Sequence, residues 1–332
     1  MLDLKNPHIQ FAIESVRTAA RLTEEVHSEM PAALSKKDKS LVTVADFSAQ
    51  AFIASRLAQE FPNEILVAEE DSSLLRGPGG EENLSLVCDY LGRFIPGVTA
   101  QKTLDWIDRG KAEPSNIRFW TMDPIDGTKG YLRGEQYAVA LALIVSGRVT
   151  LGVLGCPHLK QLSPREPGNL GTLAVAARGQ GAWKTSLYGK EEWTPLAVSK
   201  CTDPAEAVLL GSFERTHTDT VQTEELVREL RMTQPPILMD SLAQYVVLAS
   251  GAADLLFRFP SPGDPDRHEW IWDQAPGTII VEEAGGRVSD LRGNPLEFWR
   301  GRQLSANVGV VLSNGHLHEA ALKALAKVWK KS

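Results

Sequence analysis

The sequence has few cysteines and no long hydrophobic run, and each shortage excludes a class of protein. Only three cysteines, Cys88, Cys156 and Cys201, occur in 332 residues, and they lie far apart. An odd number at this spacing fits neither a disulfide framework nor a zinc knuckle. No stretch approaches the ~18 apolar residues that a membrane span requires, and the N-terminus has no basic region followed by an apolar run. We therefore expect a soluble, cytoplasmic chain with no membrane partner.

Positive charge is scarce as well. The 42 acidic residues outnumber the 35 lysines and arginines, which gives a formal net charge of −7, and no long basic run occurs. This balance argues against nucleic acid as a partner. An acidic chain also repels small anions unless its carboxylates are gathered around cations.

The remaining composition is that of a globular protein. Hydrophobic residues make up 43% and charged residues 23% of the chain, which excludes collagen-like and disordered classes. At this length a single core no longer grows with the chain, so we expect two lobes. The segment 160–171 is rich in proline, glycine and polar residues and is the best candidate for the connection, which divides the chain into lobes 1–159 and 160–332.

Hydrophobic periodicity predicts an α/β protein in which the second lobe alternates strand and helix. Asp46 is placed to cap the second expected helix, and the glycine-rich segment 77–80 predicts a loop that could serve as a lid. The expected helices are 9–30, 45–61, 82–91, 99–109, 223–231 and 242–250. The expected strands are 41–44, 65–68, 119–122, 137–145, 173–177 and 254–259.

The strongest local signal is the segment Asp123-Pro124-Ile125-Asp126-Gly127-Thr128. Proline fixes one backbone torsion and glycine permits a tight turn into a helix start. Both carboxylates and the Ile125 carbonyl oxygen can then turn toward one point, and such hard oxygen ligands suit Mg²⁺. The amides of Gly127 and Thr128, at a helix N-terminus, would hold phosphate oxygens. A type I turn with solvated aspartates would explain a lone Asp-Pro pair, but not the whole string.

Three further acids are candidates for the same site. Glu69 follows a short buried strand, and Asp273 precedes the apolar helix that runs through residues 279–281. Taken singly, each has an ordinary explanation, because acids at strand ends are commonly solvated, and Asp46 and Asp273 could simply cap helices. The functional interpretation depends on their combination.

Together these segments resemble the lithium-sensitive, magnesium-dependent phosphatase superfamily that includes inositol monophosphatase and fructose-1,6-bisphosphatase. The resemblance is carried by residues 42–46, 67–72, 123–128 and 272–275, and it spans roughly residues 10 to 325. Within this superfamily the string 119–139 is most similar to 3'(2'),5'-bisphosphate nucleotidases of the fungal and plant type. The resemblance implies a layered α+β sandwich.

It also implies the cofactor and the catalytic residues. Up to three Mg²⁺ ions would be bound, and Li⁺ would inhibit. Asp46 and Thr128 would orient and deprotonate the attacking water. The implied metal ligands are Glu69, Asp123, the carbonyl of Ile125, Asp126 and Asp273.

The implied reaction removes the 3'-phosphate of 3'-phosphoadenosine 5'-phosphate to give AMP, and also acts on the 5'-phosphosulfate form. Gln244 stands where the family has a lysine, which removes one positive charge from the substrate site. Pro276 is a second departure, but proline is tolerated in the first turn of a helix. The implied substrate contacts are Gly127, Thr128, His217, Ser241, Gln244, Arg258 and Asp273.

Two alternatives stay open at this point. A sister phosphatase acting on an inositol phosphate or a sugar bisphosphate would share the whole metal site, so only the second lobe distinguishes it. A catalytically silent relative could instead sense phosphorylated metabolites. We expect a monomer whose partner is a small phosphorylated nucleotide.

Overall fold

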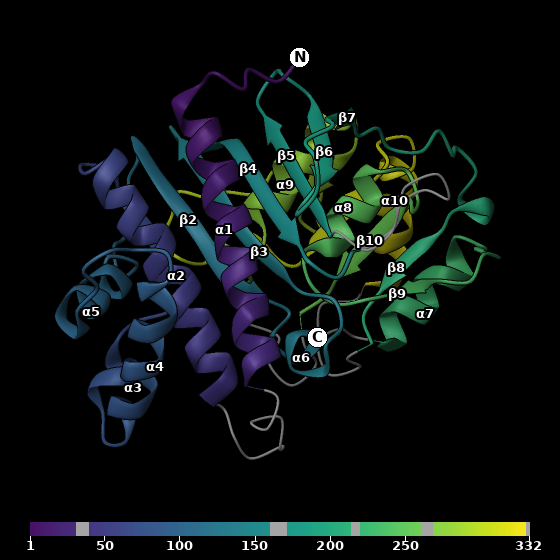
Figure 1. The fold of residues 1–332 in the computed structure, drawn as a ribbon. Coiled ribbons are helices and arrows are strands. Elements are labelled where there is room, and N and C mark those ends of the chain that lie inside the picture. Colours follow the sequence, from purple (N-terminus) through teal and green to yellow (C-terminus); the bar gives the residue numbers. More distant parts are fainter. Residues whose placement is uncertain (31–39, 160–170, 214–219, 261–267, 330–332) are drawn as a thin grey trace.

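Two β-sheets form the centre of the protein, and helices cover and separate them (Figure 1). The computed structural model describes residues 1–30, 40–159, 171–213, 220–260 and 268–329. The first sheet has seven strands in sequence order, of which only β1 and β2 pair in parallel. Its strands are β1 (Leu66–Ala68), β2 (Arg118–Asp126), β3 (Ala138–Val145), β4 (Arg148–Cys156), β5 (Thr172–Ala177), β6 (Ala182–Ser186) and β7 (Thr194–Pro195).

Alternation of side chains along β3 explains how the first sheet is covered on both faces. Val139, Leu141 and Leu143 pack in a core with helices α1 (Pro7–Glu29) and α2 (Ser40–Glu60). The intervening alanines, at positions 138, 140 and 142, face the opposite core with α8 (Ala243–Ala249) and α9 (Ala275–Glu283). Successive side chains of a strand point to opposite faces, so one strand serves both layers.

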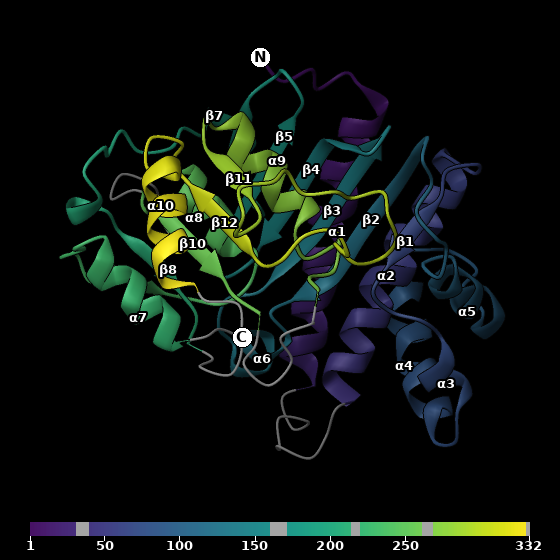
Figure 2. The same ribbon diagram turned by 180° about the vertical axis from the view of Figure 1, so that it is seen from behind.

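The second sheet lies beyond α8 and α9, and helices α7 (Thr220–Glu229) and α10 (His318–Val328) cover its outer face (Figure 2). The resulting order is helices, sheet, helices, sheet, helices, which confirms the layered α/β sandwich. Its strand order is β11-β12-β10-β8-β9. The strands are β8 (Leu209–Gly211), β9 (Ile237–Leu238), β10 (Leu255–Arg258), β11 (Arg287–Ser289) and β12 (Val310–Ser313).

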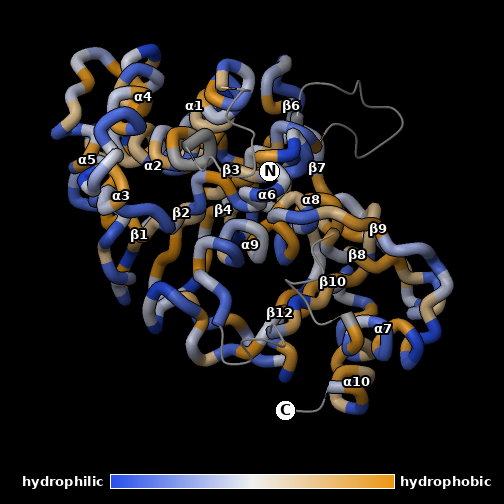
Figure 3. The backbone as a smooth tube through the Cα atoms, turned by 90° about the horizontal axis from the view of Figure 1, so that it is seen from below, coloured by the Kyte–Doolittle hydropathy of each residue, from blue (hydrophilic) through white to orange (hydrophobic). Residues whose placement is uncertain are grey.

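The other helices lie outside these layers or at their edge. In Figure 3 the hydrophobic stretches follow the strands, whereas α3 to α5 carry many hydrophilic residues. A 3-10 turn, η2 (Pro204–Glu206), precedes β8. The helices are α3 (Ser73–Arg76), α4 (Gly80–Gly92), α5 (Ala100–Asp108) and α6 (Thr128–Arg133). None of the helices in the described ranges has the length and apolar content needed to span a bilayer.

The expected strand at 41–44 is wrong, because these residues belong to helix α2. The run contains β-branched residues, but intrinsic strand preference is weak against tertiary packing. As a helix, the segment buries Val44, Ala45 and Phe47 against the first sheet. Asp46 therefore lies inside α2 and does not cap it. The other expected elements are present with shifted ends, and the glycine segment is reduced to a short connection from α3 to α4.

The first sheet continues beyond the predicted lobe boundary. Strands β5, β6 and β7 follow residue 160 and still pair with β4 or with one another. The second sheet begins only at Leu209. Most of the predicted connection, residues 160–170, lies outside the described ranges. The division at residues 159 and 160 stays a prediction.

A buried histidine makes the stability of the second sheet sensitive to pH. His318 is fully buried, with Nε2 2.9 Å from Ser289 Oγ and Nδ1 2.9 Å from Ser313 Oγ. Burial lowers its pKa to about 4. The unfolded chain therefore binds a proton that the folded chain excludes between about pH 6.5 and 4, and we expect up to ~3 kcal/mol of stability to be lost across this range.

Urea unfolding at pH 7, 5.5 and 4.5 checks this expectation. His318→Gln keeps a polar side chain that does not titrate, so its free energy of unfolding should fall less steeply with acid. Parallel curves for the two proteins would contradict the assignment.

Candidate active site

A β-bulge in β2 brings the two aspartates of the central motif to the same face. Asp123 pairs with Ala140 and Asp126 with Ala138, so three steps along β2 match two along β3. In a regular strand, residues three apart point to opposite faces, and one extra residue restores the same side. Pro124, which has no amide hydrogen, lies within this irregular stretch. Both carboxylates therefore face the layer of α8 and α9.

Parallel pairing places Glu69 beside Asp123. Ala68 pairs with Met122, so the next residue of each strand lies at the same edge of the sheet. Burial raises the pKa of Glu69, and Asp123 is the neighbouring side chain that most opposes this rise, as expected of adjacent carboxyl groups. Asp46 reaches this edge from the other face of the sheet, where it is buried in α2 close to Glu69 and Glu70.

Asp273 comes to the same point from the second half of the chain. It precedes α9, whose first residue is Ala275, and it makes no helix cap. One carboxylate oxygen from each of Asp123, Asp126 and Asp273 lies within 4.8 Å of the others. Asp126 also accepts a hydrogen bond from the backbone N–H of Leu242, which ties the motif to α8. Segments 150 residues apart therefore share one acidic cluster.

Electrostatics shows that this cluster needs a compensating charge. Burial, followed by repulsion from neighbouring acids, raises the pKa of Asp46, Asp123 and Asp273 well above the usual range. Burial also raises the pKa of Asp126, and it raises that of Glu70 to about 7. A divalent cation relieves such repulsion, and an all-oxygen set of carboxylates is the donor chemistry that Mg²⁺ prefers. The residues present therefore fit a magnesium site.

The start of α6 is held against α8 at this edge. Gly127 has φ +89°, and a Cβ atom there would lie 2.7 Å from the Cβ of Ser241. Ser241 itself has φ +73° and is buried. Thr128, the first residue of α6, is exposed, and its hydroxyl donates to the carbonyl of Ile125 at 3.4 Å. The motif and Ser241 thus form one wall of the site.

Arg258 supplies positive charge on the side of the second sheet. Its guanidinium lies 3.8 Å from Glu269 and 5.7 Å from the ring centre of Tyr245. Burial raises the pKa of Asp126 and Asp273, and the charge of Arg258 partly opposes this rise, as expected of a cation beside the acidic cluster. His217, the remaining predicted contact, lies outside the described residues.

Gln244 is buried, and its side-chain amide is already engaged. Nε2 donates to the carbonyls of Gly211 (3.1 Å) and Met239 (2.8 Å). Oε1 accepts a hydrogen bond from Arg258 at 3.4 Å. Gln244 therefore joins the ends of β8 and β9 and contacts the neighbouring arginine.

The segment around Glu69 is held in place by a residue that the sequence did not identify as part of the site. Gln50, one helical turn after Asp46, donates to the carbonyls of Glu70 (2.7 Å) and Ile107 (2.9 Å) and accepts from the N–H of Glu70 at 3.1 Å. Its spacing of four from Asp46 on an expected helix was the one available signal. Glu269, which lies beside Arg258, was also missed, because a single glutamate before a tryptophan matches no functional motif.

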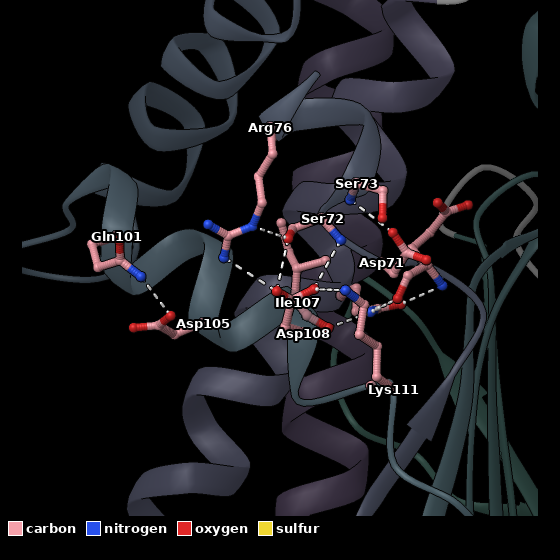
Figure 4. A network of polar contacts seen from close by, with 12 residues as sticks. Asp71, Ser72, Ser73, Arg76, Gln101, Asp105, Ile107, Asp108 and Lys111 are labelled. Carbon is pink, nitrogen blue, oxygen red and sulfur yellow. Dashed lines mark hydrogen bonds and ion pairs between the residues drawn. The ribbon is translucent and has the colours of Figure 1, made fainter.

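A polar network fixes the residues that follow Glu70 (Figure 4). Asp108, at the end of α5, accepts hydrogen bonds from the N–H of Ser72 at 3.0 Å and from its hydroxyl at 2.8 Å. Lys111 and Arg76 pair with the same carboxylate at 2.8 and 3.2 Å. These contacts lower the pKa of Asp108 to about 2 against the opposing effect of burial. The carboxylate therefore stays charged and anchors the loop.

Comparison with known proteins agrees with this architecture. The chain matches the model of the inositol monophosphatase family over residues 5–330. It belongs to this family.

Among curated relatives, the chain is 37% identical to a 3'(2'),5'-bisphosphate nucleotidase from Schizosaccharomyces pombe, over 97% of this chain and 96% of that protein. It is 38% identical to a protein of the same name from Oryza sativa, over 96% of this chain and 94% of that protein. Among solved structures, an IMPase from Thermotoga maritima matches with a TM-score of 0.64 and 21% identity over 97% of both chains. CysQ from Bacteroides thetaiotaomicron matches with a TM-score of 0.62 and 19% identity over 92% of this chain and 96% of that one. These structures share the fold.

Two glycine substitutions test the close contact between α6 and α8. Gly127→Ala forces an alanine to φ +89° and drives its Cβ into Ser241. Gly179→Ala is a matched control, because Gly179 has φ +76° but no atom within 4 Å of an added Cβ. We expect the control to cost ~1 kcal/mol of unfolding free energy and Gly127→Ala to cost ~1–3 kcal/mol more, measured by urea denaturation. Equal losses would show that the contact is not tight.

Proposed function

We propose that the protein is a Mg²⁺-dependent phosphatase that hydrolyses the 3'-phosphate of 3'-phosphoadenosine 5'-phosphate to AMP and phosphate. The observation that carries the proposal is the convergence of buried and half-buried carboxylates from both halves of the chain at one sheet edge. The substrate follows from the 37% and 38% identical relatives, which are named 3'(2'),5'-bisphosphate nucleotidases. The corresponding phosphosulfate is a second expected substrate.

The oxygen atoms at this edge would hold up to three Mg²⁺ ions. When bound, these ions neutralise phosphoryl charge and lower the pKa of water at the site. The proposed ligands are Glu69, Asp123, the Ile125 carbonyl, Asp126 and Asp273. Gln50 and the Asp108 network keep Glu69 at its place in this set.

Asp46 and Thr128 would orient the attacking water and accept its proton. Thr128 is exposed at the site, and its hydroxyl is held toward the Ile125 carbonyl. Asp46 is buried on the opposite side of the cluster, close to Glu69. The phosphoryl group would be transferred in line to water, so the chain needs no covalent nucleophile.

The remaining contacts would bind the nucleotide. Arg258 is a cation next to the acidic cluster, and we assign it to the second phosphate. Ser241 and the N–H groups of Gly127 and Thr128 line the same wall. His217 is assigned to the nucleotide on the resemblance alone.

A substrate panel with a Mg²⁺ titration tests the function. We expect phosphate release from the 3'-phosphate nucleotide to require Mg²⁺ and to exceed release from inositol phosphates and sugar bisphosphates. Asp126→Asn removes a charge that the cations require, and it should lower kcat by about a thousandfold or more with an unchanged circular dichroism spectrum. Millimolar Li⁺ should inhibit the wild-type protein.

Each contrary result has its own meaning. A preference for inositol phosphates would identify the sister activity. A folded wild-type chain inert toward every phosphomonoester would indicate a sensor. Near-wild-type turnover in Asp126→Asn would overturn the metal assignment.

Gln244→Lys tests how this chain binds the second phosphate. A lysine ammonium can replace the amide as donor to the Gly211 and Met239 carbonyls, and it adds a charge beside Arg258. We expect KM for the nucleotide bisphosphate to fall about tenfold. Gln244→Met removes the amide without adding charge and is the control. An unchanged KM in Gln244→Lys would show that this position does not contact the second phosphate.

The cytoplasmic location and the monomeric state expected from the sequence stay predictions.

A further inference from the structure

Arg302 joins the segments that carry Glu69 and Asp273, two acids of the candidate metal site. Its Nη2 donates to the carbonyl of Ala68, the residue directly before Glu69. The guanidinium also lies 4.9 Å from the ring centre of Trp272, the residue directly before Asp273. One side chain therefore contacts the immediate neighbours of two acids that are 204 positions apart in the sequence.

The rest of the guanidinium is committed to backbone. Nη1 donates to the carbonyls of Gly110 (3.0 Å) and Ala112 (3.2 Å). Gly110 in turn accepts from the N–H of Ala68 at 2.9 Å, so Arg302 binds both sides of the turn that supports the end of β1. The planar fork of arginine suits several carbonyls at once, which a lysine ammonium cannot reproduce with the same geometry.

The backbone of the same segment pairs with the segment that leads to Asp273. The carbonyl of Arg302 accepts from the N–H of Ile271 at 3.0 Å, and the N–H of Leu304 donates to the carbonyl of Glu269 at 2.9 Å. Trp272 is buried and stacks on Trp270 with 4.9 Å between ring centres. Arg302 is thus fixed to the Asp273 side by its backbone and to the Glu69 side by its side chain.

The hydrogen bonds described for the Arg302 side chain go to carbonyl groups, and none of them goes to a carboxylate of the site. Burial lowers the pKa of Arg302, and the acids that oppose this shift are Glu113 and Asp71. Its donors face carbonyl groups, and Trp272 lies against its guanidinium. Its effect on the site must therefore come through the positions of other groups.

We infer that Arg302 is a positioning residue that sets the distance between Glu69 and Asp273 and thereby the affinity of the site for Mg²⁺. The inference rests on the proposed function, since it takes these two acids as ligands of the same ion cluster. A change outside the ligand set typically weakens metal binding by about 10- to 100-fold when it frees a ligand to move.

Calorimetric titration with Mg²⁺ alone, without nucleotide, provides the test. Arg302→Lys keeps the charge but loses the fork, and we expect at least about tenfold weaker Mg²⁺ binding. Activity should show the same shift in the Mg²⁺ concentration for half-maximal rate, with kcat at saturating Mg²⁺ reduced less than about threefold. Arg287→Lys is the matched control. Arg287 forms an exposed ion pair with Glu319 at 2.6 Å, and its lysine variant should bind Mg²⁺ as the wild type does.

A double-mutant cycle distinguishes positioning from a general structural role. If Arg302 acts through Glu69, then Arg302→Lys in a Glu69→Gln background should weaken Mg²⁺ binding by less than about twofold. Full additivity, or unchanged Mg²⁺ affinity in folded Arg302→Lys, would overturn the inference while leaving the proposed function intact. Failure of Arg302→Lys to fold would also overturn it, because the contact would then support the whole chain. Absence of Mg²⁺ binding by the wild type would instead remove the proposed function, and the inference with it.

Discussion

Repulsion among closely spaced carboxylates is the constraint on which the rest of the site depends. Asp46, Asp123 and Asp273 each have a pKa raised first by burial and then by neighbouring acids, of which Glu69 acts on all three. Left free, such groups would move apart or take up protons. Around Glu69, the chain fixes the neighbouring backbone with hydrogen bonds from outside the cluster, made by Gln50, Asp108 and Arg302. The scaffold around the acids is therefore built from amide, carboxylate and guanidinium groups that bind the main chain.

The two faces of the cluster differ in chemistry. On the β1 side, the supporting groups bind the backbone and leave the carboxylates uncompensated. On the second-sheet side, Arg258 provides a fixed positive charge, and Gln244 contacts it without adding another. A substrate that bridges the cluster and this arginine would meet metal cations at one end and the Arg258 guanidinium at the other. This asymmetry fits a molecule that carries two phosphates of unequal role.

Sequence patterns predicted much of the fold but little of the support around the site. The central motif and the strand before Glu69 could be found because their residues are close in sequence and unusual in combination. The run at 41–44 was misassigned because strand preference is weaker than the burial of α2. Arg302 and Glu269 could not be found, because their partners lie far away in the chain and each residue alone is ordinary. The engagement of Gln244 by two carbonyls likewise depends on the pairing of β8 and β9.

The bulge in β2 fixes the number of residues that can separate Asp123 and Asp126 in a working site. Asp123 and Asp126 share a face only because one extra residue stands between their partners on β3. Removing one residue would turn one carboxylate to the opposite layer, and adding one would do the same. Substitutions can therefore accumulate around the motif, but its residue count cannot drift by one. The acids of this site could change identity in small steps, whereas their spacing could change only with loss of the cluster.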